Sequence, residues 1–346
     1  MRRLIRLILI VLVLSMPVSA LEITAPEVPD SGKDLMPSTT SSFGEGLLEV
    51  LQDAVGYFQP ELRQAGGVCA CVIGVVMVIS ILETIPGSRP GTVELAGTVA
   101  IAVLLLNASD ALVGLGTETV RQVSEYGKLL LPVMTAAMAA QGGITTASAL
   151  YTGSAFFNSL LSGLIVSVLT PMVYLYLALS VCSSAVGEDT LKKLRDSVKG
   201  GMVWMLKTIL YVFTGYIGIT RVVSGTTDAV ALKAAKLTIS GVVPVVGSIL
   251  SDASEAVLVG AGTVKNAAGI YGLLAVLAVW LGPFVKIGTH YLMLKLTAGL
   301  CGIFGNKRMS ELVNDFSTAM GFVVAMTGAV CLMLMISTVC FMKGVS

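Results

Sequence analysis

Long apolar stretches recur along the chain and alternate with shorter polar segments. Six of these stretches are continuous and lack the strict alternation of a β-strand; they cover residues 66–82, 95–115, 160–186, 201–219, 267–285 and 319–342. A helix needs about 20 apolar residues to cross a hydrocarbon core of about 30 Å, and the shortest of these runs is close to the lower limit. The pattern therefore predicts an all-α fold, a polytopic helical membrane protein with about six spans.

Two further apolar stretches, 129–150 and 241–266, contain helix breakers. The breakers are Pro132, Gly142 and Gly143 in the first stretch and Pro244 and Gly247 in the second. Irregular backbone at membrane depth is tolerated only where it is buried in protein or lines a water-filled cavity. We therefore predict two proline-broken re-entrant segments. The alternative for 241–266 is a loop that lies on the membrane surface.

Charged residues follow the second set of breakers. They are Asp252, Glu255 and Lys265, with the polar Asn266 beside them. A charge at the centre of a spanning helix costs about 2.5–3.5 kcal/mol on insertion scales, so these residues are candidates to line a pathway or to pair across the re-entrant hairpin. Lys286 is a further candidate because it follows an apolar span directly. The alternative for Lys286 is a side chain that extends to the membrane interface.

The two broken stretches begin similar units. The same 39-residue spacing separates Pro132 from Pro171 and Pro244 from Pro283, and a charged segment and a last apolar stretch follow each pair. We predict a tandem internal repeat, with membrane repeat 1 at 129–223, a surface helix at 224–240 and membrane repeat 2 at 241–346. The alternative is coincidence, because proline and glycine are frequent in membrane helices.

The start of the chain indicates its orientation. Residues 1–20 combine arginines, an apolar core and a Val-Ser-Ala end, as a signal peptide does. We expect an extracytoplasmic segment at 21–65, disordered at first and then forming one amphipathic helix, and a two-span unit at 66–128. Basic loops stay in the cytoplasm, which places 192–199 and 307–308 inside. An odd number of crossings must separate the outer segment 21–65 from the cytoplasmic loop 192–199, but four apolar stretches lie between them. We therefore predict that 129–150 does not cross, which leaves six full spans with Ser346 outside.

Composition narrows the chemistry. Hydrophobic residues make up 55% of the chain and charged residues 12%, with a mean hydropathy of +0.89. The net charge of +1 gives no basis for a nucleic-acid partner. The six cysteines lie in or beside apolar runs, His290 is the only histidine, and no nucleophile or nucleotide-binding motif accompanies them. We expect no enzyme activity, cofactor or metal site, and membrane lipid as a partner.

Short strings of the chain resemble a known family, the stage III sporulation protein AE family. They are SGVVPVVG at 240–247, LSDA at 250–253, VKN at 264–266 and LPVM at 131–134. The order of signal, outer segment and spans fits as well. The resemblance covers roughly residues 43–342, and its proline-glycine string is more specific than its apolar spans.

The resemblance implies a function in endospore-forming bacteria. Members of this family are taken to lie in the mother-cell membrane around the forespore. There they are part of a channel-like complex with the other stage III A-operon membrane proteins, including a secretion-type ATPase, and with a forespore membrane partner. We therefore expect a channel or transport component needed for forespore development. The alternatives are a non-conducting membrane scaffold for that complex and a self-contained small-solute transporter.

Overall fold

The computed structural model is described over residues 25–38, 42–85, 90–242, 247–304 and 307–343, with side chains over the same ranges except 90 and 221–264. Throughout these ranges the regular structure is helical, which confirms the all-α prediction. The elements are α2 (Asp30–Lys33), α3 (Phe43–Glu83), α4 (Pro90–Ala140), α5 (Ile144–Leu164), the π-helix η1 (Ile165–Leu169), α6 (Thr170–Val186), α7 (Asp189–Val242), α8 (Gly247–Ile303) and α9 (Lys307–Met342).

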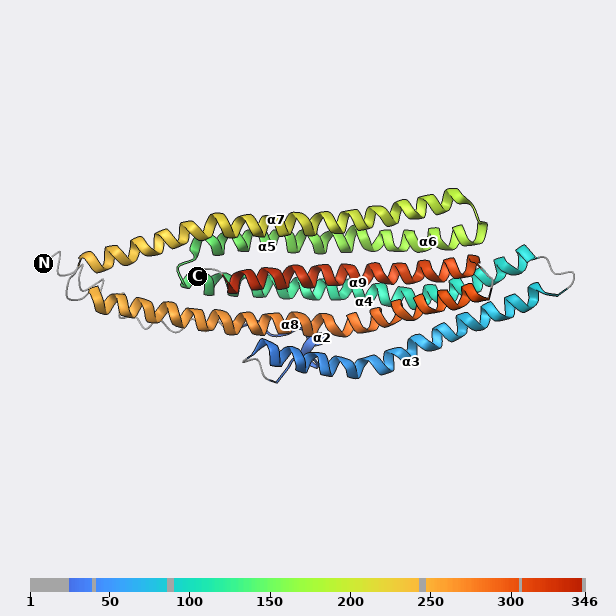
Figure 1. Cartoon of the computed structure of the whole chain (residues 1–346), viewed down its shortest axis with the longest axis horizontal. Helices are drawn as coiled ribbons and strands as arrows, with labels where there is room; N and C mark the ends of the chain where they lie inside the picture. Colours follow the sequence, from blue (N-terminus) through green and yellow to red (C-terminus); the bar gives the residue numbers. More distant parts are fainter. Residues whose placement is uncertain (1–24, 39–41, 86–89, 243–246, 305–306, 344–346) are drawn as a thin grey trace.

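The long helices lie side by side and alternate in direction (Figure 1). Helices α3, α6 and α8 finish at one end of the bundle, where α7 and α9 begin with charged residues. We call this the basic end, and the opposite end, where α4 meets α5 and α9 finishes, the far end. Within the described residues, six helical stretches are long and apolar enough to cross a membrane, with α5, η1 and α6 counted as one.

The helices are longer than the apolar runs that predicted them. Helix α3 has 41 residues and joins the expected amphipathic helix to the first span, while α4 has 51 and α8 has 57. At 1.5 Å per residue, α4 measures about 75 Å, which is more than twice the thickness of a hydrocarbon core. Residues 117–128, which lie between two of the apolar stretches, therefore form no loop but are part of α4.

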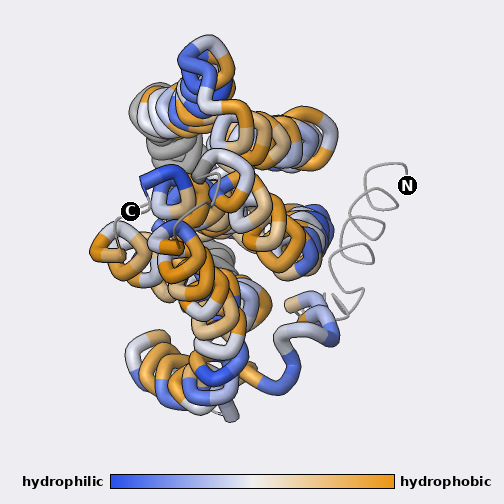
Figure 2. Tube along the Cα trace, turned by 90° about the vertical axis from the view of Figure 1, so that its right-hand side faces the viewer, coloured by the Kyte–Doolittle hydropathy of each residue, from blue (hydrophilic) through white to orange (hydrophobic). Residues whose placement is uncertain are grey.

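Helices α8 and α9 lie in the interior, and α7 lies at the edge. Large side chains from α9, such as Phe316 and Phe341, are fully buried. On α7, by contrast, Trp204 and Tyr211 are 67% and 73% exposed. Seen along the bundle, hydrophobic residues lie on the outer surfaces of the helices as well as between them (Figure 2). An apolar exterior of this kind is expected where helices face lipid.

The prolines affect the helices differently. The prediction that Pro132 interrupts its helix is wrong, because α4 continues through Pro132 to Ala140. Its ring lies on the exposed side of α4, where the loss of one backbone donor is tolerated. Just before Pro171 the helix is distorted into η1, in which the Thr170 N–H bonds to the Ile165 carbonyl, five residues earlier.

The break in 129–150 lies at its glycines. Gly142 has a positive φ of 90°, a conformation that favours glycine. The Gly143 N–H bonds to the Met138 carbonyl at 3.3 Å, so the chain reverses between α4 and α5. The re-entrant position of this segment and the internal repeat remain predictions.

The segment before α3 is more ordered than we expected. Over 25–38 the chain packs on α8, with Val28 and Leu35 buried. Gly32 lies so close to Val279 that a Cβ there would be 2.7 Å from its side chain. Apolar contacts made by these few residues therefore overcome the disorder that the polar composition suggested.

Candidate functional site

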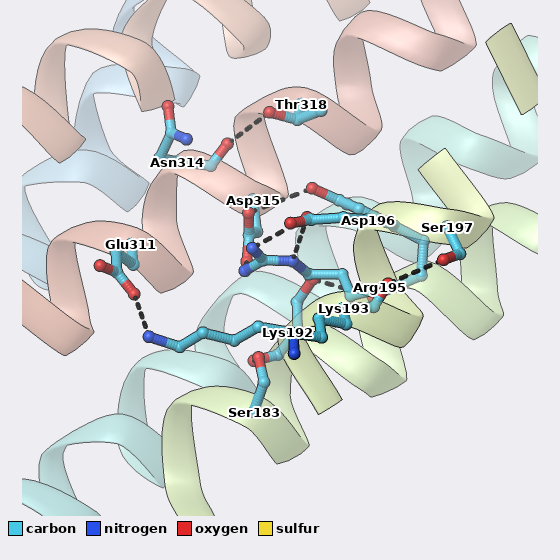
Figure 3. Close-up of polar contacts among 12 residues, drawn as sticks. Ser183, Lys192, Lys193, Arg195, Asp196, Ser197, Glu311, Asn314, Asp315 and Thr318 are labelled. Carbon is cyan, nitrogen blue, oxygen red and sulfur yellow. Dashed lines mark hydrogen bonds and ion pairs between the residues drawn. The ribbon is translucent and has the colours of Figure 1, made fainter. Parts of the chain in front are cut away.

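A buried ion pair joins α7 to α9 near the basic end (Figure 3). The Arg195 guanidinium binds the Asp315 carboxylate, and the two side chains are only 13% and 8% exposed. From α6, the Tyr176 hydroxyl donates a hydrogen bond of 3.1 Å to the same carboxylate. One carboxylate therefore connects three helices, and its charge is neutralised where water is scarce.

Further polar contacts surround this pair. Lys192 Nζ lies 3.2 Å from Glu311 Oε2, and Arg195 also reaches Asp196. Toward α8, Lys295 donates to Asn314 at 2.6 Å. Sequence analysis treated the charged segments only as topology signals. It missed their mutual pairing because the complementary charges lie more than a hundred residues apart. The available signal was that both segments mix the two charges: Lys192 and Arg195 stand in the first, and Glu311 and Asp315 follow Lys307 and Arg308 in the second.

A second polar cluster lies between α3 and α8, farther from the basic end. Lys286 Nζ is 3.4 Å from Glu61 Oε1, and the two side chains are 37% and 18% exposed. The other carboxylate oxygen of Glu61 is buried and has no hydrogen-bond partner among the described residues. Glu61 was not a candidate in the sequence because it lies in the expected extracytoplasmic helix. The structure thus gives Lys286 a partner that sequence analysis did not name.

His290 lies one helical turn beyond Lys286. It is buried, and its Nδ1 is 3.0 Å from the Lys286 carbonyl oxygen. The ring borders a small cavity between α3, α4 and α8 that Cys69 and Ser109 also line. Glu61, Lys286 and His290 therefore form one polar seam, which we call the α3–α8 seam. It places charged and hydrogen-bonding groups between α3 and α8, while the neighbouring cavity is very small and lined mostly by apolar side chains.

The structure does not bring the other candidates into this seam. Lys265 is buried and Asn266 exposed, where the described side chains of α8 begin, about six turns before Lys286. Pro244 lies outside the described residues. For three others, Gly247, Asp252 and Glu255, only the helical backbone is described. Their role in lining a pathway therefore remains a prediction, as does that of Pro132, Gly142 and Gly143.

Metal binding finds no support in the described part of the chain. Among those residues no group of three or more histidine, cysteine or acidic side chains is placed to hold an ion. The chemistry available in the α3–α8 seam is that of charge pairing and hydrogen bonding.

Comparison with protein families gives a match over residues 33–344 to the model described as stage III sporulation protein AE. This match covers most of the chain. The chain belongs to the stage III sporulation protein AE family. Together with the six apolar helices, this membership makes it a multi-pass membrane protein of a sporulation family.

A curated relative supports the same assignment. The chain is similar to stage III sporulation protein AE of Bacillus subtilis (strain 168), with 23% identity over 237 residues. The similar region covers 68% of this chain and 59% of the relative. No solved structure matches the chain.

Proposed function

We propose that this member of the stage III sporulation protein AE family provides a polar route across the membrane, as the channel or transport component of a sporulation complex. The observation that carries the proposal is the α3–α8 seam. A membrane protein that only holds others together does not need a charged pair and a histidine between its helices. Ionisable groups inside membrane helices are expensive, and they mark pathways more often than structural joints.

The geometry of the seam supports this proposal. Glu61 and Lys286 neutralise each other, so the seam can exist between helices without an isolated charge. The buried, unpartnered oxygen of Glu61 is available to a water molecule or a polar solute. The adjacent His290 and Ser109 extend the hydrogen-bonding surface toward α4. We infer from this arrangement that polar solutes pass along α8.

The location and partners belong to the same proposal. We place the protein in the mother-cell membrane around the forespore, with the other stage III A-operon membrane proteins, a secretion-type ATPase and a forespore membrane partner. Family membership supports this placement.

A specific observation favours the scaffold as a second candidate function. On α3, five apolar side chains are exposed at heptad spacing; they are Leu48, Leu51, Val55, Phe58 and Leu62. Such a row suits a partner helix. A scaffold uses this row and has no need of the α3–α8 seam, so variants of the seam separate the two functions.

The test compares Glu61→Gln, Lys286→Gln and the exchanged pair Glu61→Lys with Lys286→Glu. Arg63→Gln is the matched control, because Arg63 is exposed on the same helix. Membrane abundance, co-purification of the complex and spore yield are measured for each. We expect both single variants to accumulate and assemble while spore yield falls at least tenfold, and Arg63→Gln to be normal. Normal yield for both single variants, or a yield that falls only in step with assembly, contradicts the route and supports the scaffold.

A further inference from the structure

A single charged residue interrupts the apolar stretch 201–219 of α7. This residue is Lys207, and its side chain is exposed. Trp204 lies three residues before it and Tyr211 four residues after it, so the three side chains share one face of the helix. The side chains of Trp204 and Tyr211 are 67% and 73% exposed. We call these three residues the α7 row.

The composition of the α7 row is typical of a membrane boundary. Tryptophan and tyrosine are enriched where hydrocarbon meets the lipid headgroups, because each combines an apolar ring with a polar atom. A lysine in an apolar stretch can place its stem in hydrocarbon and extend its ammonium group into the headgroup layer. The row therefore suits a headgroup layer better than the centre of the hydrocarbon.

Contacts between helices show what lies level with the α7 row. The apolar stretch 95–115 of α4 ends just before Thr117, whose hydroxyl lies 3.2 Å from the Thr170 hydroxyl. Two residues farther along α6, Met172 lies beside Gly201 of α7. The end of the apolar stretch of α4 is therefore level with the start of the apolar stretch of α7.

These two stretches extend in opposite directions from their common level. The stretch of α4 extends toward the basic end, and 201–219 extends toward the far end. Hydrocarbon around the first stretch has its far boundary at this level, and hydrocarbon around the second has its near boundary there. Trp204 and Lys207 thus lie within about 10 Å of a membrane boundary in either arrangement, because Lys207 is only six residues beyond Gly201.

Positive charge on this face of α7 is not matched within the protein. Lys193 continues the face toward the basic end, and no ion pair between described residues includes Lys193 or Lys207. The nearby Asp196 already takes part in an ion pair. At Gly200 no atom lies within 4 Å of an added Cβ, so the surface next to Trp204 is open. Anionic headgroups therefore have room at this face and two lysines as positive partners.

We propose that this face of α7 binds anionic phospholipid, with the headgroup phosphate at Lys207 and the Trp204 ring at the base of the headgroup layer. Charge complementarity favours this occupant, because the α7 row and its continuation to Lys193 contain no acidic residue. A neutral lipid would cover the aromatic rings and leave the lysines without a counter-ion. The inference goes beyond the proposed function and does not depend on the α3–α8 seam.

The experiment uses the fluorescence of Trp204 in the full chain, reconstituted in vesicles of phosphatidylcholine and phosphatidylglycerol. The chain has two tryptophans, so Trp280→Phe leaves Trp204 alone. Bromine is carried on the acyl chains of phosphatidylglycerol or, at equal bromine content, on those of phosphatidylcholine. Because a lysine near the membrane surface attracts anionic lipid severalfold, we expect bromine on phosphatidylglycerol to quench Trp204 about twofold more. Trp204→Phe in the otherwise unchanged protein gives the same signal by difference if Trp280→Phe does not fold.

Matched variants test the role of charge. Lys207→Gln should make quenching by the two brominated lipids equal. Lys199→Gln, an exposed position on another face of α7, should leave the difference unchanged. Equal quenching before any lysine is replaced, or a difference that persists in Lys207→Gln, overturns the proposal. Bromine near the headgroup should also quench Trp204 more than bromine near the chain end, and the reverse order would place the ring in the hydrocarbon centre and overturn the proposed position.

Discussion

The α3–α4 pair and the α7–α9 pair carry their apolar stretches at different depths. Ser80 of α3 bonds to the Phe304 carbonyl of α8, and Glu61 pairs with Lys286, so 66–82 of α3 is level with the last part of α8. In α9, Ser317 donates to the Tyr291 carbonyl and Thr327 accepts from Trp280, so 319–342 is level with the middle part of α8. The offset is about 20 residues, or about 30 Å along a helix.

This difference shows that hydropathy identifies apolar stretches but not their relative heights. One flat slab of about 30 Å cannot cover both stretches if the helices stand upright in it. The helices are also fastened differently. Arg195 and Asp315 join α7 to α9 through a buried ion pair, whereas the ion pair of α3 with α8 is partly exposed. The α7–α9 pair should therefore be the more sensitive to single substitutions near the basic end.

Breaking the α7–α9 connection should have the largest effect. Arg195→Ala leaves the Asp315 carboxylate buried without its counter-ion, and loss of one partner of a buried pair costs about 3–5 kcal/mol. We expect a large drop in membrane abundance and in the melting temperature of the purified protein. Lys199→Ala, an exposed position on the same helix, is the control. Equal stability of the two variants would show that the pair does not join the helices.

Crowding the contact of α5 with α7 should have the next largest effect. At Gly153 a Cβ would lie 1.8 Å from the Tyr216 ring, whose hydroxyl bonds to the Ala149 carbonyl. Gly153→Ala must displace this ring, at about 1–3 kcal/mol. At Gly163 on the same helix, no atom lies within 4 Å of an added Cβ, so Gly163→Ala should be neutral or slightly stabilising. Thermal unfolding in detergent measures both, and a harmless Gly153→Ala would contradict this packing.

Substitution of Pro132 in α4 should separate an effect on stability from an effect on function. Alanine is about 3 kcal/mol better than proline in a helix interior, and up to about 1 kcal/mol of this is lost through the more flexible unfolded chain. Pro132→Ala should thus stabilise α4 by about 2–3 kcal/mol. Pro132 also keeps the Lys128 carbonyl free of a helix hydrogen bond, so we expect spore yield to fall although the protein is more stable. A destabilised Pro132→Ala protein would indicate that α4 is not continuous there.

The depth difference itself can be measured without a change in stability. Val78 of α3 is 55% exposed and Tyr211 of α7 is 73% exposed, so a fluorophore on a cysteine at either site is on the surface. If hydrocarbon surrounds α7 at 201–219, brominated lipid should quench the probe at position 211 about twofold more than the probe at 78. Equal quenching would mean that the bundle tilts until both stretches enter the same slab.

Local sequence patterns were enough to predict the all-helical fold and the six helical stretches that can span a membrane. Apolar runs and basic segments act locally, so they are visible in one sequence. The pairings of Glu61 with Lys286 and of Arg195 with Asp315 were not visible, because packing rather than sequence spacing decides which residues meet. Pro132 misled the prediction for a related reason. A proline on an exposed helix face can be tolerated when neighbouring helices hold the rest of the turn.

Helices α7 and α8 continue past the far end of the bundle (Figure 1). Gly269 of α8 lies against Met342 in the last turn of α9, so the residues from Gly247 onward project about 30 Å beyond that level. One part of helix α8 thus lies outside the bundle and the other part lies inside it. A lateral force on the outer part would tilt the whole helix and shift Lys286 relative to Glu61. Force applied outside the bundle would then reach the α3–α8 seam mechanically.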